Sequence, residues 1–435
     1  MRYRRALATT PTKNISFGPL RTSVRLDTRE ELINGLQEAI QIEHGLMLQY
    51  LFAAVSCKRH VREGVTEEEA EVIRQWEAGI LGVARDEMAH LATACNLVTA
   101  VGGSPDFNRP NFPQEAHRWF PFGFQLERLG TESLNRFVRA ESPKPTLLAL
   151  SARDIAPDPI EFDYVGELYG LIGNGFRNLV PDDPITKQPD SQAEATLFIG
   201  RPDAQDASDW SANLTIPSIT NRRAAEAAIT FIVEQGEGNS AGQTGSHFDT
   251  FSTIAREHEQ RTSARPGFTP SRNVMKNPLT RRHRDAGIGF NLIESSTLAH
   301  PTAELFNHVY ASALLLLMQF FDPAGETPDQ RQVLQDTARR VMSGLVRPLA
   351  EVLTTLPATT DPRGPTAGPP FELYGVLKLP AHPRARFIIL SERFAAAAAE
   401  TQRLWKTGGP SVARLEFLHR NCVLVRETLV AAQAS

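Results

Sequence analysis

Two long amphipathic segments near the N-terminus constrain the fold of this chain more than any other feature of its sequence. Segments 27–60 and 66–102 each carry apolar residues at helical spacing over more than thirty residues. Asp27 and Glu30 have the spacing of a capping box that would start the first helix, and Gly64 marks the short turn between the two. Helices of this length joined by a short turn predict an antiparallel hairpin, which is half of a four-helix bundle.

The chain after this hairpin supplies the second half of the predicted bundle. Segment 104–159 is rich in proline and aromatic residues and predicts a long crossover. A third helix is expected over 159–179, and a fourth that begins near residue 219, breaks at a glycine-rich stretch and resumes at residue 247. The predicted fold class is therefore all-α: a ferritin-like four-helix bundle with a long crossover.

Further helical segments follow the bundle. Apolar residues recur at helical spacing in four C-terminal stretches, 304–321, 328–356, 387–406 and 412–432. They predict additional C-terminal helices, interrupted by one proline- and glycine-rich loop. We predict three parts: an N-terminal extension over 1–26, the bundle over 27–260, and a C-terminal helical extension over 261–435 that packs on the bundle.

Charge and cysteine content narrow the range of partners. The chain has 46 basic and 50 acidic residues, for a net charge of −4, so its charge favours neither nucleic acid nor a membrane surface as a partner. Cys57, Cys95 and Cys422 are too few and too widely spaced for a disulfide framework or a CxxC metal motif. The N-terminal residues lack the apolar segment of a secretory signal, and the longest apolar stretch is too short to cross a bilayer. We expect a soluble, cytoplasmic protein and leave open whether it is a homo-oligomer.

Charged residues interrupt the apolar stripes of the two long segments. In the second segment a stripe that runs from Trp76 to Leu97 passes through Glu87 and His90, so these two side chains should point into the core. In the first segment Glu43 has the same position within its stripe. A buried carboxylate is costly unless it takes up a proton, pairs with a base or binds a cation, and one metal site solves this problem for several carboxylates at once.

The third and fourth segments each add a glutamate at a matching position. Residues at helical spacing flank Glu167 on both sides and lead into Glu234, which gives one inward glutamate for each helix. A second Glu-x-x-His is not intact, because Glu237 stands where the histidine would be, and His247 is the first suitable histidine after the glycine-rich stretch. The pattern predicts a pair of iron ions, with manganese left open, and a ligand set of Glu43, Glu87, His90, Glu167, Glu234 and His247, with Glu237 as a bridging or outer carboxylate.

Each of these residues also has a plainer interpretation. A Glu-x-x-His pair on a helix often arises by chance, and a buried glutamate can pair with an arginine, which would make the chain a metal-free helical scaffold. The same ligands can also serve iron handling, as in a ferroxidase or a storage protein, without an organic substrate. Four inward glutamates on four helices favour a metal site over the scaffold.

The motifs around these residues resemble those of the ferritin-like family that includes the iminophenylpyruvate dimer synthases of violacein- and rebeccamycin-type pathways. The resemblance rests on short motifs that follow one another over most of 32–373. They are LQEAIQIEHGLMLQYLFA around Glu43, DEMAHLATACNLVTAVGGSP with Glu87 and His90, VGELYGLI with Glu167, IVEQGEG with Glu234 and Glu237, SHFDTF with His247, and TAGPPFEL.

The resemblance implies an oxidative reaction on a small molecule in secondary metabolism, where amino-acid-derived imines are coupled. Together with the ligand set it predicts a non-haem di-iron oxidase or oxygenase that binds O2 and oxidises a small organic substrate. Oxidation, oxygenation and oxidative coupling of imino acids all stay open at this point, as does the identity of the substrate. The sequence contains no CxxCH motif for haem attachment.

Overall fold

The regular structure of the chain is helical. The structure, a computed structural model, describes residues 24–116, 122–142, 165–201, 216, 218–236 and 245–433. Within this part of the chain the only sheet consists of two short parallel strands, β1 (Pro278–Leu279) and β2 (Asn291–Leu292). The predicted all-α class is confirmed.

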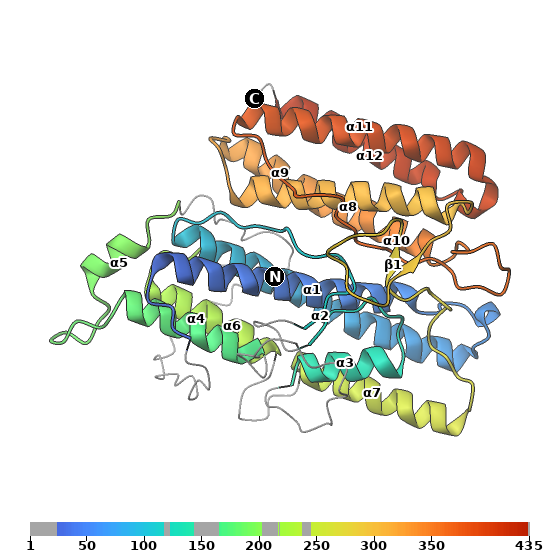
Figure 1. Cartoon of the computed structure of the whole chain (residues 1–435), viewed down its shortest axis with the longest axis horizontal. Helices are drawn as coiled ribbons and strands as arrows, with labels where there is room; N and C mark the ends of the chain where they lie inside the picture. The colour runs from blue at the N-terminus through green and yellow to red at the C-terminus, as the bar shows by residue number, and fades with distance from the viewer. Residues whose placement is uncertain are drawn as a thin grey trace, which may run out of the picture.

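The long N-terminal hairpin lies at the centre of the molecule. It consists of α1 (Arg29–Ser56) and α2 (Glu67–Ala100), which pack against each other along their length (Figure 1). The first helix begins one residue later than predicted, because Thr28 and not Asp27 is its cap. The hydroxyl of Thr28 accepts a hydrogen bond from the backbone of Glu31, whose carboxylate accepts one from the backbone of Thr28 in return.

The other half of the bundle contains helices at the predicted positions of the third helix and of the broken fourth helix, and one further short helix. It consists of two pairs of shorter helices, which lie side by side beneath the hairpin in Figure 1. One pair is α4 (Val165–Leu179) with α6 (Arg222–Gly236), and the other is α3 (Thr131–Ala140) with α7 (His247–Ala264). Since α6 also contacts α7, the two pairs meet beneath the hairpin. This junction is where the buried carboxylates lie.

Parts of the predicted second half fall outside the described residues. These are the start of the third helix at 159–164, most of the glycine-rich break before residue 247, and most of the stretch between α5 (Ser191–Leu197) and α6. The crossover between α2 and α4 is described in part, and it contains α3, which starts at Thr131.

The C-terminal helices form a second layer on the opposite face of the hairpin (Figure 1). In this layer α8 contacts α2, and α10 contacts α1. The additional C-terminal helices are confirmed, whereas the proposed boundaries between the three parts of the chain stay a prediction. The layer consists of α8 (Ala299–Phe321), α9 (Pro328–Val341), η3 (Met342–Val346), α10 (Arg347–Leu353), α11 (Pro383–Gly408), η4 (Gly409–Val412) and α12 (Leu415–Ala432), and η1 (Val61–Glu63) lies in the turn of the hairpin.

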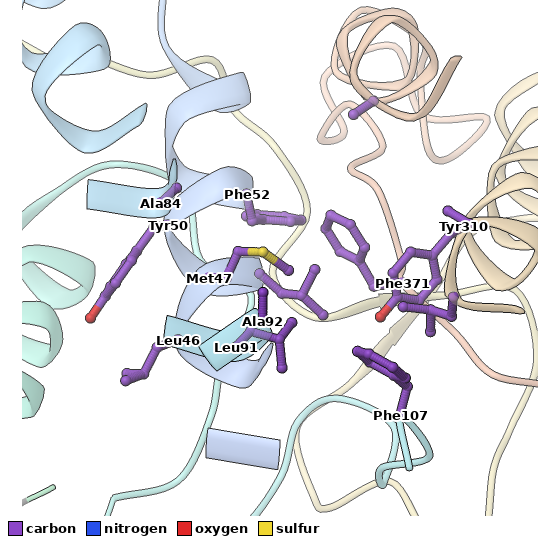
Figure 2. Close-up of a cluster of buried hydrophobic side chains, with 14 of the residues drawn as sticks. Leu46, Met47, Tyr50, Phe52, Ala84, Leu91, Ala92, Phe107, Tyr310 and Phe371 are labelled. Carbon is purple, nitrogen blue, oxygen red and sulfur yellow. The ribbon is translucent and has the colours of Figure 1, made fainter. Parts of the chain in front are cut away.

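Helix α1 has one face for each layer. Figure 2 shows Met47 and Phe52 pointing toward Phe371 and Tyr310 on the C-terminal side, where all are buried. Burial of side chains of this size contributes about 2 kcal/mol each, so this apolar contact holds the second layer on the hairpin. Tyr50 points to the opposite side of α1, toward the short helices (Figure 2). None of the helices in the described residues is long and apolar enough to cross a membrane.

Candidate metal centre

The two helices of the hairpin bring three predicted residues together. Glu43 of α1 and Glu87 and His90 of α2 are each at most 2% exposed. The Nδ1 atom of His90 lies 3.0 Å from Oε2 of Glu87 and 3.7 Å from Oε2 of Glu43. Glu87 and His90 share a face of α2 because they are three positions apart, and that face points at Glu43 of α1.

His247 completes the arrangement from the first turn of α7. The helix starts there because the Ser246 hydroxyl accepts a hydrogen bond from the backbone of Asp249. Nδ1 of His247 lies 3.0 Å from Oε1 of Glu87, so the two oxygens of Glu87 face two different imidazoles. The ligand atoms of Glu87, His90 and His247 all lie within 4.8 Å of one another.

A third carboxylate, Glu141, was missed by the sequence analysis. It caps the C-terminal end of α3, and its Oε2 atom lies 3.5 Å from Nδ1 of His247. The sequence does contain a signal for it. Leu134 and Phe137 are buried on α3, and Glu141 continues this stripe at helical spacing, just as Glu87 continues the stripe of α2. The segment was interpreted as a crossover, so its stripe was not followed to this residue.

Glu234 does not point inward, contrary to the prediction. Its side chain is exposed, and the next residue, Gln235, takes the inward position. The reason is the phase of α6, whose buried residues Ala228 and Ile232 bring Gln235 and not Glu234 to the core face. Oε1 of Gln235 lies 2.9 Å from Nε2 of His90.

Two other predicted ligands are not seen in the cluster. Glu167 is buried in the first turn of α4, but the residues of α4 that line the cavity at the site are Val165, Gly166 and Tyr169. Glu237 lies outside the described residues. Their roles as ligands stay predictions. We refer below to Glu43, Glu87, His90, Glu141 and His247 as the carboxylate–histidine cluster.

The donor set of the cluster fits a metal better than it fits internal hydrogen bonding. Both ring nitrogens of His247 are buried without a hydrogen-bond partner in the described part of the chain, although Glu87 and Glu141 lie within 3.5 Å of Nδ1. A buried imidazole rarely forgoes its hydrogen bonds, and a cation between it and the carboxylates would use the free nitrogen.

In the metal-free cluster, burial and close neighbouring charges shift the pKa values of several side chains. Burial and the nearby charge of Glu87 raise the pKa of Glu43 to about 7. Burial lowers the pKa of His90, but the carboxylates of Glu87 and Glu43 outweigh it and raise that pKa to about 10. The pKa of His247 is raised well above its ordinary value, because Glu87, Asp86 and Glu141 likewise outweigh burial. Without a metal the cluster therefore holds extra protons at neutral pH.

A small cavity lies against the cluster. Its volume is about 20 Å³, and Glu43, Glu87, His90 and Glu141 contribute to its wall. The rest of the wall comes mainly from the ends of α3, α4 and α6, where the two pairs of short helices meet. Within the described residues, a cavity of this size holds about one water molecule or one molecule of O2.

Comparison with known proteins shows to which family this chain belongs. A family model described as ferritin-like matches residues 36–256, just over half of the chain, and this range includes the whole carboxylate–histidine cluster. The chain belongs to the ferritin-like family. The family resemblance and the ferritin-like fold predicted from the sequence are thereby confirmed.

Two curated proteins resemble this ferritin-like chain over most of its length. Dichlorochromopyrrolate synthase from Lentzea aerocolonigenes is 32% identical over 391 residues, which are 81% of this chain and 37% of that protein. The 2-imino-3-(indol-3-yl)propanoate dimerase from Chromobacterium violaceum is 27% identical over 367 residues, 80% of this chain and 34% of that protein. The chain therefore spans about a third of the length of these relatives. A ferritin-like protein from Caulobacter vibrioides aligns in structure over 73% of this chain and 96% of its own, at 19% identity and a TM-score of 0.45.

Proposed function

We propose that this chain is a non-haem di-iron oxidoreductase that activates O2 and oxidises a small, amino-acid-derived substrate in secondary metabolism. The observation that carries the proposal is the position of Glu87, whose two carboxylate oxygens each lie 3.0 Å from a different imidazole nitrogen. Each imidazole also has a carboxylate of its own, Glu43 beside His90 and Glu141 beside His247. The donor set thus divides into two halves that share Glu87, as expected for a pair of cations.

The charge of the site supports cations over a protein partner. Among the described residues, every ion pair of Glu43, Glu87 and Glu141 is with a histidine and none is with an arginine. In a metal-free scaffold, the imidazoles of His90 and His247 would be the only basic partners that the described residues offer to three buried carboxylates. Mixed oxygen and imidazole donors suit iron, with manganese as the nearest alternative.

The cluster would hold the metal pair, and the residues around it would orient its ligands and shield the site. Gln235 accepts a hydrogen bond from Nε2 of His90, which keeps Nδ1 of that ring turned toward the cluster. Leu46 and Ile232 line the cavity with apolar groups and limit the entry of bulk water. Reduced iron, when bound, would supply electrons for the reduction of O2.

The proposed substrate class comes from the relatives. Their names describe the synthesis of dichlorochromopyrrolate and the dimerisation of an indolyl imino acid. Joining two imino acids through a new carbon–carbon bond removes one hydrogen atom from each, and O2 can accept both. We therefore propose an imino acid of this kind as the substrate, and oxidative coupling as the reaction.

The test loads metal-free protein with ferrous iron under argon, adds 2-imino-3-(indol-3-yl)propanoate and then admits O2. We expect O2 uptake that depends on the imino acid, and a coupled product detected by mass spectrometry. The double variant Glu87→Ala/His90→Ala is the matched control and should give neither. O2 uptake that is independent of the imino acid and yields only ferric iron would indicate iron handling instead, and a failure to bind iron would contradict both functions.

A further inference from the structure

Two buried tyrosines contact the outer carboxylates of the cluster. Tyr169 of α4 donates a hydrogen bond to Oε1 of Glu43 at 2.5 Å, and Tyr50 of α1 donates one to Oε1 of Glu141. Both side chains are at most 1% exposed, so water does not compete for these hydroxyls. Each tyrosine lies on a different helix from the carboxylate that it contacts.

The hydrogen bond from each tyrosine occupies one oxygen of its carboxylate and leaves the other oxygen facing an imidazole. In Glu43 the tyrosine takes Oε1, while Oε2 faces Nδ1 of His90 at 3.7 Å. In Glu141 the second tyrosine takes Oε1, while Oε2 faces Nδ1 of His247 at 3.5 Å. Glu87 differs, because both of its oxygens face an imidazole. On both sides of the cluster, therefore, one carboxylate oxygen contacts a tyrosine and the other faces an imidazole.

We propose that Tyr50 and Tyr169 are positioning residues that restrict Glu141 and Glu43 to one ligating oxygen each, so that coordination positions stay open on both metal ions. This inference rests on the proposed metal site. A carboxylate can bind a metal through one oxygen or two, and a hydrogen bond to one oxygen disfavours the second metal contact. Open positions are what a site needs in order to bind O2 or another small molecule, and the cavity beside Glu43 and Glu141 is where such a molecule would fit.

Cobalt(II) provides a test that does not depend on turnover. Its visible absorption weakens as its coordination number rises, and azide binds only where a position is open. The proteins compared are the wild type, Tyr50→Phe, Tyr169→Phe and Tyr310→Phe. Tyr310 is a matched control, because it is buried and its hydroxyl is hydrogen-bonded to His44 and Arg109, away from the cluster. Cobalt stoichiometry, absorption per cobalt, azide affinity and helix content by circular dichroism are measured for each.

We expect the wild type and Tyr310→Phe to bind two cobalt ions with the same spectrum. Tyr50→Phe and Tyr169→Phe should also bind two, with absorption per cobalt lowered roughly twofold and azide affinity lowered about tenfold, because the freed oxygen occupies an open position. Spectra and azide affinities equal to those of the wild type in both variants would overturn the inference. Because the two tyrosines lie on different helices, one variant that fails to fold leaves the other as the test. A wild-type protein without bound cobalt would refute the metal site itself, which is a separate outcome.

Discussion

Two buried glutamates that each lie beside a histidine have opposite surroundings in this molecule. In the C-terminal layer Glu372 is 1% exposed and lies 2.9 Å from Nε2 of His283. Its other oxygen accepts hydrogen bonds from the backbone and hydroxyl of Thr280 and from the amide of Asn307, at 2.9, 2.8 and 2.6 Å. Protein donors satisfy this carboxylate, so it joins the residue after β1 and helix α8 to the loop that carries Glu372, and it needs no ligand.

The carboxylate–histidine cluster has too few donors for its carboxylates. Glu43 and Glu141 each receive one tyrosine hydroxyl, and Glu87 lies between two imidazoles, one of which has no hydrogen bond in the described part of the chain. A buried glutamate beside a histidine is therefore not in itself a sign of a metal. The sign is a surplus of buried hydrogen-bond acceptors over protein donors.

The largest expected effect comes from removing the shared ligands. Glu87→Ala/His90→Ala should reduce bound iron from two ions per chain to none, as measured by elemental analysis. Glu372→Gln, the matched change in the satisfied pair, should keep both ions. Full iron content in the double variant would show that the cluster, like the Glu372–His283 pair, does not bind iron.

The next effect is the pH dependence of metal affinity. The pKa of His90 is raised to about 10 and that of His247 is raised well above its ordinary value, so both rings are protonated in the metal-free protein at pH 7. Metal binding must expel these protons, and affinity should therefore rise with pH, by about tenfold per pH unit for each proton released. Between pH 6 and pH 8 we expect a gain of about a hundredfold for each of the two protons.

Calorimetric titration of the protein with metal in buffers of different ionisation enthalpy measures the number of protons released. A titration heat that is independent of the buffer would show that the imidazoles are neutral before the metal binds, and would contradict the ionisation described for the cluster.

The third effect distinguishes two adjacent residues of α6. Gln235→Leu removes the hydrogen bond to Nε2 of His90 and should weaken metal binding by about 10- to 100-fold. Glu234→Gln changes an exposed side chain and should leave the affinity unchanged. Dissociation constants for cobalt or manganese test this directly, and the reverse result would restore Glu234 as a ligand.

The smallest effect is on stability, and its sign should differ between the two regions. A carboxyl group whose pKa is raised to about 7 destabilises the folded state as pH rises from about 4.5 through 7, because the unfolded chain ionises more easily. In metal-free protein at pH 8, Glu43→Gln should therefore raise the free energy of unfolding by about 1–2 kcal/mol. Glu372→Gln should lower it by about 1–3 kcal/mol, since it disturbs satisfied donors. Urea denaturation measures the change in the free energy of unfolding for both variants. Changes of the same sign would contradict the difference between the two regions.

The sequence predicted the residues of the cluster best where the helices are long. Glu43, Glu87 and His90 lie far from the ends of α1 and α2, whose uninterrupted stripes fix which residues face the core. The structure brings His247 to the same place, as the sequence analysis expected, although that residue starts a separate helix. Long-range pairing of these helices followed from their length and the short turn between them.

The sequence predicted fewer of the residues at the cluster where the helices are short. In α6 an error of one residue in phase exchanged Gln235 for Glu234, because few buried positions define the stripe of a helix of 15 residues. Glu141 ends a helix of 10 residues inside a segment that was interpreted as a crossover. The contacts of Tyr50 and Tyr169 depend on which helices meet at the cluster, and spacing along the chain does not determine that.

The most direct measurement is a crystal structure of the iron-loaded protein with anomalous scattering recorded at the iron edge. The expected result is two iron peaks, one beside His90 and Glu43 and the other beside His247 and Glu141, with Glu87 between them. The absence of iron from this cluster in crystals grown with ferrous iron, or a single ion there, would contradict it.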